Sequence, residues 1–336
     1  MADLRTTYMG IQLSNPLIAG ASDLTANMDT ISRIEEEGAG AMVLKSLFEE
    51  QIQMERFRLE EDQHRGEALY SEMATIFPTF NHAGPREHLM WVRKTKTVVK
   101  IPVIASLNAV NKATWVEYAK LLAEEGVDGL ELNFFATPRD ADTTGSSVEE
   151  EQLDALAAVT STVKAPVAVK LSHFYSNPLN FMKKAVEAGA RGLVLFNRLF
   201  QPDIDIENRT ITLPFNFSAR VDHKLPLRYA GLLYGEISAD VCASTGIMTG
   251  VDVVKMLLAG ASAVQTVTSL YRHGIGMIGK MKEELSKWMD RKLYASIADF
   301  KGALSRKNTK DPWAYSRAQY AKMLLDPKQF MEPIRP

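Results

Sequence analysis

The chain has 336 residues, of which 46% are hydrophobic and 24% charged, a balance typical of a soluble globular protein. The formal net charge of −2 leaves no excess of basic side chains to neutralise phosphates, which argues against a nucleic-acid-binding protein. No apolar run reaches the roughly 18 residues needed to span a bilayer, and the first residues lack the apolar core of a signal peptide. The single cysteine, Cys242, fits a buried strand in a cytoplasmic protein, and no Cys/His spacing indicates a metal site.

Ahead of the first expected strand, residues 6–9 and 11–13 on either side of Gly10 predict a short hairpin. Eight apolar runs rich in β-branched residues follow, separated by helical hydrophobic patterns. The expected strands are 17–21, 41–47, 102–107, 129–134, 166–171, 192–196, 240–243 and 261–267. The expected helices are 28–37, 86–98, 112–125, 148–163, 178–188, 227–237, 251–259 and about 276–288.

The order of these elements predicts the fold. The strands are almost continuously apolar, which indicates a parallel sheet covered on both faces. Eight strands, each followed by a helix, predict an α/β fold: a single (β/α)8 TIM barrel with an N-terminal hairpin and a C-terminal helical extension. A doubly wound sheet is the competing arrangement, but the first turn, Gly20-Ala21-Ser22, lacks the G-x-G-x-x-G pattern.

Similar glycine-containing endings recur in several helices, which favours one repeated module over two domains. We therefore expect a single domain over 1–336, with a barrel core at about 15–288 and a helical tail at 289–336 that covers the barrel or contacts another subunit. Two long connections, 49–84 and 197–226, leave the carboxyl ends of strands, where barrel enzymes build their sites. Within the second, 204–206 and 210–212 predict another hairpin.

Residues 241–270 form the most informative segment of the sequence. A strand, a loop with Gly246 and Gly250, an amphipathic helix and a second strand lead into the turn Thr266-Val267-Thr268-Ser269. Two neighbouring helix N-termini at such a place would bind a phosphate group. The alternative is an ordinary βαβ unit with turn glycines, but the position at expected strands seven and eight favours the phosphate site.

Polar side chains follow four of the expected strands. Lys45 and Lys170 each end an apolar run, and a buried ammonium group needs a partner. Either lysine alone is consistent with a structural ion pair. Two such lysines beside a phosphate site instead indicate that a bound anion or an electron-accepting ring lies there. The amides of Asn133 and Asn197 either bind a planar polar substrate or cap the strand ends.

These residues carry a family resemblance. YMGIQLSNPLIAGAS at 8–22, VLKS at 43–46, ELN at 131–133, VKL at 169–171 and TGIMTGVDVVKMLLAGASAVQTVTSL at 245–270 resemble the dihydroorotate dehydrogenases, in order, over about 6–285. The resemblance implies an FMN-containing barrel that oxidises dihydroorotate to orotate in pyrimidine synthesis. It is closest to the cytoplasmic class of that family, whose simplest members are homodimers.

The resemblance also assigns roles to single residues. It places the FMN phosphate on Gly246, Ile247, Val267 and Thr268, and the flavin ring beside Ala21 and Ser22. Lys45, with Ser46, lies close to ring and substrate, and Lys170 lies at the N1/O2 side of the flavin, where reduction places negative charge. Asn133 and Asn197 hold the substrate.

The sequence departs from the family in the loop that carries the catalytic Ser or Cys. Residues 134–139 read FFATPR, without a cysteine, and Arg139 stands in place of a second substrate asparagine, which suggests an anionic substrate. Thr137 is the nearest hydroxyl, and His173 or His82 is an alternative base. The family has an asparagine-rich loop after the second strand, and Asn81 is the one residue here that could correspond to it.

Thr245 and Val267 stand where the family has two glycines. Backbone N–H groups could still bind the phosphate group after both replacements. The first hypothesis is therefore a dihydroorotate dehydrogenase, and the second a related FMN oxidoreductase for a different small anionic or heterocyclic substrate. A non-catalytic flavin-binding barrel and a sugar-phosphate barrel are further alternatives. Because no cysteine cluster is present for an iron–sulfur centre, we expect a small electron acceptor such as fumarate.

Overall fold

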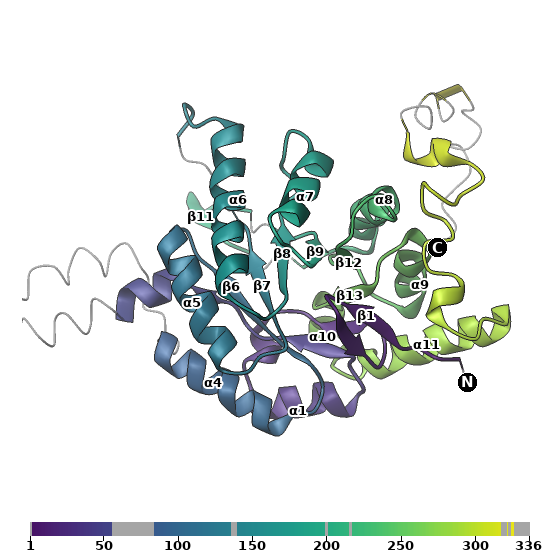
Figure 1. Cartoon of the computed structure of the whole chain (residues 1–336), viewed down its shortest axis with the longest axis horizontal. Helices are drawn as coiled ribbons and strands as arrows, with labels where there is room; N and C mark the ends of the chain where they lie inside the picture. The colour runs from purple at the N-terminus through teal and green to yellow at the C-terminus, as the bar shows by residue number, and fades with distance from the viewer. Residues whose placement is uncertain are drawn as a thin grey trace, which may run out of the picture.

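The computed structural model describes residues 2–55, 84–135, 140–198, 201–214, 217–316, 321 and 324–325. Its centre is a closed barrel of parallel strands (Figure 1). The barrel strands are β3 (Leu17–Ala19), β4 (Ala41–Val43), β6 (Val103–Asn108), β7 (Gly129–Asn133), β8 (Val167–Leu171), β9 (Gly192–Leu195), β12 (Asp240–Ala243) and β13 (Ala263–Thr266). The last strand, β13, pairs with the first, β3, and β4 pairs with β6, so the sheet has no open edge. The predicted (β/α)8 barrel is confirmed.

The helices surround this barrel (Figure 1). They are α1 (Met28–Glu36), α4 (Pro85–Val98), α5 (Lys112–Glu124), α6 (Gly145–Thr162), α7 (Pro178–Glu187), α8 (Lys224–Leu233), α9 (Gly250–Ala259), α10 (Thr268–His273) and α11 (Met277–Lys292). The bounds of three helices differ from the prediction by three or four residues: α11 ends at Lys292 rather than about 288, and α6 and α8 are displaced. Helix α6 begins three residues earlier than expected, because Thr144 caps a polar first turn that carries no hydrophobic pattern. Helix α8 ends earlier because Gly235 adopts a φ of 75°.

The expected second strand is divided. Residues after β4 leave the ladder, and the chain rejoins it as β5 (Leu47–Phe48), which again pairs with β6. Lys45 and Ser46 lie in this interruption, so their side chains are presented at the carboxyl end of the barrel rather than in a regular ladder.

The N-terminal hairpin closes the opposite end of the barrel. Strands β1 (Thr6–Tyr8) and β2 (Ile11–Leu13) pair as predicted, and Tyr8, Met9 and Leu13 are buried against the barrel interior. The interior side chains that they meet are apolar or small: Ile18, Ala41, Val43, Ile104, Ala168, Val194, Cys242 and Ala263. Burial raises the pKa of the Cys242 thiol, so this side chain is a packed strand residue and not a nucleophile.

Two peripheral segments complete the described chain. The second predicted hairpin is confirmed, with β10 (Asp203–Asp205) and β11 (Thr210–Thr212) aligned so that Ile204 faces Ile211. The described tail contains the short 3₁₀ helices η3 (Ile297–Asp299) and η4 (Pro312–Tyr315), and it bonds through the Gly302 and Leu304 amides to the C-terminal end of α9.

None of the helices in the described ranges is long and apolar enough to cross a bilayer. The same ranges contain no group of three His, Cys, Asp or Glu side chains that could hold a metal ion.

His88 in α4 is expected to make the fold sensitive to acid. Its Nε2 atom is buried and bonds to none of the described residues, and burial, with the nearby positive charge of Lys45, lowers its pKa from 6.5 to about 4. The unfolded chain takes up this proton near pH 6.5, whereas the folded chain resists it down to about pH 4. The free energy of unfolding should therefore fall by up to about 3 kcal/mol as the pH decreases through this interval.

Urea unfolding of the protein and of His88→Gln at neutral pH and near pH 4.5 measures this effect. The variant should lose less stability between the two conditions, while the exposed His273→Gln serves as the control. Equal losses in all three proteins would exclude His88 as the cause.

Candidate active site

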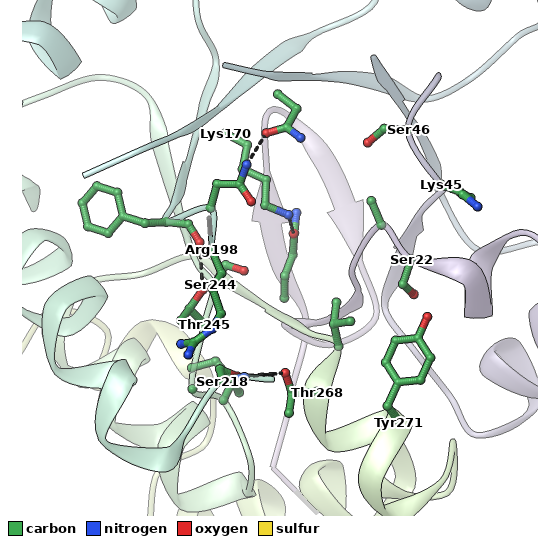
Figure 2. A pocket seen from close by; sticks show the side chains of 18 of the residues that line it. Ser22, Lys45, Ser46, Lys170, Arg198, Ser218, Ser244, Thr245, Thr268 and Tyr271 are labelled. Atoms are coloured by element: carbon green, nitrogen blue, oxygen red, sulfur yellow. Dashed lines mark hydrogen bonds between the residues drawn. The ribbon is translucent and has the colours of Figure 1, made fainter. Parts of the chain in front are cut away.

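A cavity of about 280 Å³ opens at the carboxyl ends of the barrel strands (Figure 2). In Figure 2, Ser22, Lys45 and Tyr271 lie on one side of it, and Ser244 and Thr245 lie on the other. Its lining combines residues that follow β3, β4, β9, β12 and β13 with residues of the strands themselves, which are Phe48 of β5, Asn133 of β7, Lys170 of β8 and Gln265 of β13. Because the hairpin packs against the other end of the barrel, the cavity lies at the end opposite the hairpin.

The floor of the cavity is a buried charged network. Lys170 is 8% exposed, and its Nζ donates to Gln265 Oε1 at 3.1 Å and lies 3.5 Å from Glu131 Oε1. Gln265 Nε2 in turn donates to Glu131 Oε2. Lys170 and Gln265 line the cavity, whereas Glu131 lies beneath them and is 1% exposed. The network places a compensated ammonium group below any bound ligand.

Two asparagines form a polar wall beside this floor. Asn197 Nδ2 donates to Asn133 Oδ1 at 2.8 Å, and Asn108 Nδ2 donates to the backbone oxygen of Asn133 at 3.2 Å. The first bond fixes both amides in one orientation and leaves the Asn133 NH₂ group and the Asn197 carbonyl oxygen for a ligand. This arrangement suits a planar ring that carries both donors and acceptors.

Lys45 lies across the cavity and is paired. Its Nζ donates to Asp23 Oδ1 at 2.6 Å, and the Asp23 amide donates to the Tyr271 hydroxyl at 3.1 Å. Ser46 is hydrogen-bonded to Ser106 at 2.7 Å. Asp23 is more exposed than Lys45, so the pair is open to solvent and an anionic ligand could compete for the lysine.

The loop after β12 has a strained backbone and a tightly packed glycine. Thr245 and Gly246 have φ angles of 77° and 76°, and a Cβ atom on Gly246 would lie 2.4 Å from the backbone nitrogen of His223. The amides of Gly246, Ile247 and Thr268 find no acceptor among the described residues. Thr268 Oγ1 accepts from Ser218 Oγ at 2.9 Å, which leaves the threonine proton free to donate into the cavity.

The start of α9 contributes less to the predicted phosphate site than expected. Carboxylates already accept from three amides at this helix start. Asp252 Oδ2 accepts from the amides of Met248 and Thr249, and Glu284 Oε2 accepts from the amide of Gly250. The donors available to an anion therefore belong to the strained loop at 245–247 and the start of α10.

The structure brings most of the predicted site residues around one cavity. The predicted residues that line it are Ala21, Ser22, Lys45, Ser46, Asn133, Lys170, Asn197, Gly246, Ile247, Val267 and Thr268. His173 is not among the lining residues; its ring packs on Phe174 at 4.0 Å and on Phe196 at 6.1 Å, and burial lowers its pKa. Asn81, His82, Thr137 and Arg139 lie outside the described residues.

Sequence reasoning noted Thr245 only as a replaced glycine and missed other lining residues, which are Asp23, Phe48, Phe196, Arg198, Ser218, Ser244, Gln265 and Tyr271. One of them carried a usable signal. A glutamine within the apolar strand β13, two residues after the inward-facing Ala263, must also face the barrel interior. Ser218 and Arg198 come from a long connection without periodicity, so no pattern marks them.

The fold and site define a class: a (β/α)8 barrel protein with a buried Lys170–Glu131 pair at the floor of a cavity and a strained loop after β12. Residues 3–289 match the model of the dihydroorotate dehydrogenase family. This chain belongs to the dihydroorotate dehydrogenase family.

Relatives support this assignment over nearly the whole chain. The chain is 28% identical to dihydroorotate dehydrogenase B (NAD(+)), catalytic subunit, of Thermoplasma volcanium, over 90% of this chain and 98% of the relative. It is 30% identical to a putative dihydroorotate dehydrogenase A (fumarate) of Aeropyrum pernix, over the same shares. A chloroplastic dihydropyrimidine dehydrogenase (NADP(+)) of Arabidopsis thaliana is 22% identical, over 89% of this chain and 76% of the relative.

Thr245 is expected to be strained, since a β-branched residue at positive φ is unfavourable. Its hydroxyl donates to the Phe196 carbonyl at 2.9 Å, so Thr245→Ala loses this bond and keeps the strain, whereas Thr245→Gly loses the bond and relieves the strain. The glycine variant should be the more stable by about 1 kcal/mol, which reverses the usual order.

Denaturant unfolding of both variants measures the difference. Ser244, which is not at positive φ, provides the matched pair Ser244→Gly and Ser244→Ala, and there alanine should be the more stable. The same order at both positions would contradict strain at Thr245.

Proposed function

We propose that this protein is an FMN-dependent oxidoreductase that oxidises dihydroorotate to orotate in pyrimidine biosynthesis, acting on the C–C single bond of the substrate ring. The observation that carries the proposal is the buried Lys170 at the floor of a cavity that also contains free backbone donors. Family membership and the names of the relatives support the same reaction.

The residues present fit FMN. The phosphate group would be held by the amides of Gly246, Ile247 and Thr268, where a side chain at 246 would block the approach. The ring would lie beside Ala21 and Ser22, with Lys170 beneath its pyrimidine edge. When bound, FMN accepts the hydride that leaves the substrate.

The protein's own residues bind the substrate and stabilise the negative charge that develops during the reaction. The free NH₂ group of Asn133 and the free carbonyl oxygen of Asn197 hold the substrate ring. Lys170 supplies positive charge where negative charge accumulates during the reaction. Lys45 exchanges its exposed partner Asp23 for the substrate carboxylate, with Arg139 as a further cation outside the described residues.

The proton acceptor is the least family-like part of the site. The loop 134–139 has no Cys or Ser, and Thr137 is its one hydroxyl. We assign proton removal to the Thr137 Oγ1 atom. Because a threonine hydroxyl is a weak base, the rate of proton removal should be about 10²–10⁴ lower than with an activated base.

This departure favours a second candidate: a related FMN oxidoreductase for another small anionic or heterocyclic substrate. The observations behind it are the loop without a usual base and Arg139 in place of an asparagine. The chloroplastic dihydropyrimidine dehydrogenase shows that relatives of this chain include proteins named for a different pyrimidine.

The proposal also includes a cytoplasmic homodimer and a small electron acceptor such as fumarate. A single buried cysteine suits a reducing compartment and cannot hold an iron–sulfur cluster. Size-exclusion chromatography with light scattering should give twice the chain mass of 37.4 kDa. A monomeric mass at micromolar concentration would contradict the dimer.

Anaerobic mixing of the purified protein with L-dihydroorotate tests the function. The visible flavin band should bleach, and Lys170→Gln should retain flavin but lower the bleaching rate by about 10- to 1,000-fold, since up to about 4 kcal/mol of charge stabilisation is lost. The exposed Lys183→Ala is the control and should behave as the parent protein.

Three outcomes are distinguishable. Bleaching in the parent protein and its loss in Lys170→Gln supports the first candidate. A yellow protein that stays yellow excludes dihydroorotate and favours the second candidate. A colourless protein that binds no added FMN overturns the cofactor assignment.

A further inference from the structure

Glu131 is a buried carboxylate that the mechanism above leaves without a role. It lies on β7, below the cavity, and does not line it. Its Oε2 atom accepts from Gln265, whereas its Oε1 atom accepts no hydrogen bond within the described ranges and lies 3.5 Å from Lys170 Nζ. A negative charge at this depth is costly unless Lys170 compensates it.

The three side chains orient one another. A lysine ammonium only donates hydrogen bonds, and a carboxylate only accepts them. The Gln265 amide, which joins them from β13 on the other side of the barrel, must therefore turn its oxygen to Lys170 and its nitrogen to Glu131. The glutamine has no second orientation that satisfies both partners.

This arrangement sets the direction of Lys170. One of its three protons is donated to Gln265, and the ion pair with Glu131 at 3.5 Å holds the ammonium group on that side, so that its remaining N–H groups are available to a ligand in the cavity. Below the network the barrel contains apolar side chains such as Ile18, Ile104 and Val194. Because these side chains are buried and apolar, the charge of Glu131 is weakly screened on that side and acts strongly on Lys170 and on the cavity.

We propose that Glu131 is a positioning residue that aims the Lys170 ammonium group at the cavity and offsets part of its charge, and thereby sets the reduction potential of the flavin bound there. The inference rests on the proposed function, because it concerns a flavin in this cavity. In this inference Lys170 stabilises negative charge on the ligand, and Glu131 limits how strong that stabilisation is.

The test is the midpoint potential of the FMN-loaded protein, measured by equilibration with a reference dye. Glu131→Gln keeps the side-chain shape and removes the offsetting charge, so the reduction equilibrium should shift toward reduced flavin by at least about tenfold, or about 30 mV for two electrons. Asp240→Asn is the matched control, because Asp240 is a carboxylate at the closed end of the barrel, beside Met9 and Lys301. Its potential should equal that of the parent protein.

A second background shows whether Glu131 acts through Lys170. In Lys170→Gln the ammonium group that Glu131 aims and offsets is absent, so adding Glu131→Gln should change the equilibrium by less than about twofold. An equal shift in both backgrounds would overturn the positioning role. Unchanged potential in Glu131→Gln would overturn the inference as a whole.

A third variant keeps the test usable if Glu131→Gln does not fold. Glu131→Asp retains the charge but withdraws it from Lys170 by one methylene group, and it should shift the potential in the same direction by a smaller amount. A potential identical to that of the parent protein would again overturn the inference. Failure of the parent protein to bind flavin is a different result, which overturns the proposed function instead.

Discussion

The compensation of a buried lysine is the interaction on which the site depends. Lys170 lies inside a barrel whose lower half is apolar and whose lower end is closed by the N-terminal hairpin. A charge in this position persists only with a partner, and Glu131 and Gln265 supply the partners from strands on two sides of the barrel. The closed sheet holds the three strands rigidly, so barrel architecture and site electrostatics are parts of one arrangement.

The shape of the upper half of the cavity is determined by backbone geometry more than by side chains. Thr245 and Gly246 adopt left-handed backbone angles where they line the cavity, and the packing of Gly246 against His223 prevents a side chain from occupying that space. The buried Asp252 holds the next residues of the loop through the amides of Met248 and Thr249. Asp252 thus anchors the loop, while the amides of Gly246 and Ile247 bond to no acceptor in the part of the chain that the structure describes.

Much of the fold was predictable because strand and helix periodicities are local, and the apolar strands and glycine-terminated helices were expected close to their observed bounds. Lys170 and Asn133 were predictable for the same reason, since a polar residue at the end of an apolar strand stands out. The partners were not. Glu131 and Gln265 meet across the barrel, and Asp23 reaches Lys45 from a neighbouring turn, so only the closed fold brings them together. The occupied N-terminus of α9 is a tertiary effect as well, because Glu284 belongs to a different helix.

The central claim is that this cavity holds FMN through a phosphate contact with the loop at 245–247 and the start of α10. The most direct measurement is calorimetric titration of flavin-free protein with FMN and, separately, with riboflavin, which lacks only the phosphate group. Several backbone donors on a charged phosphate predict at least about 100-fold tighter binding of FMN. Equal affinities for the two ligands would contradict the account.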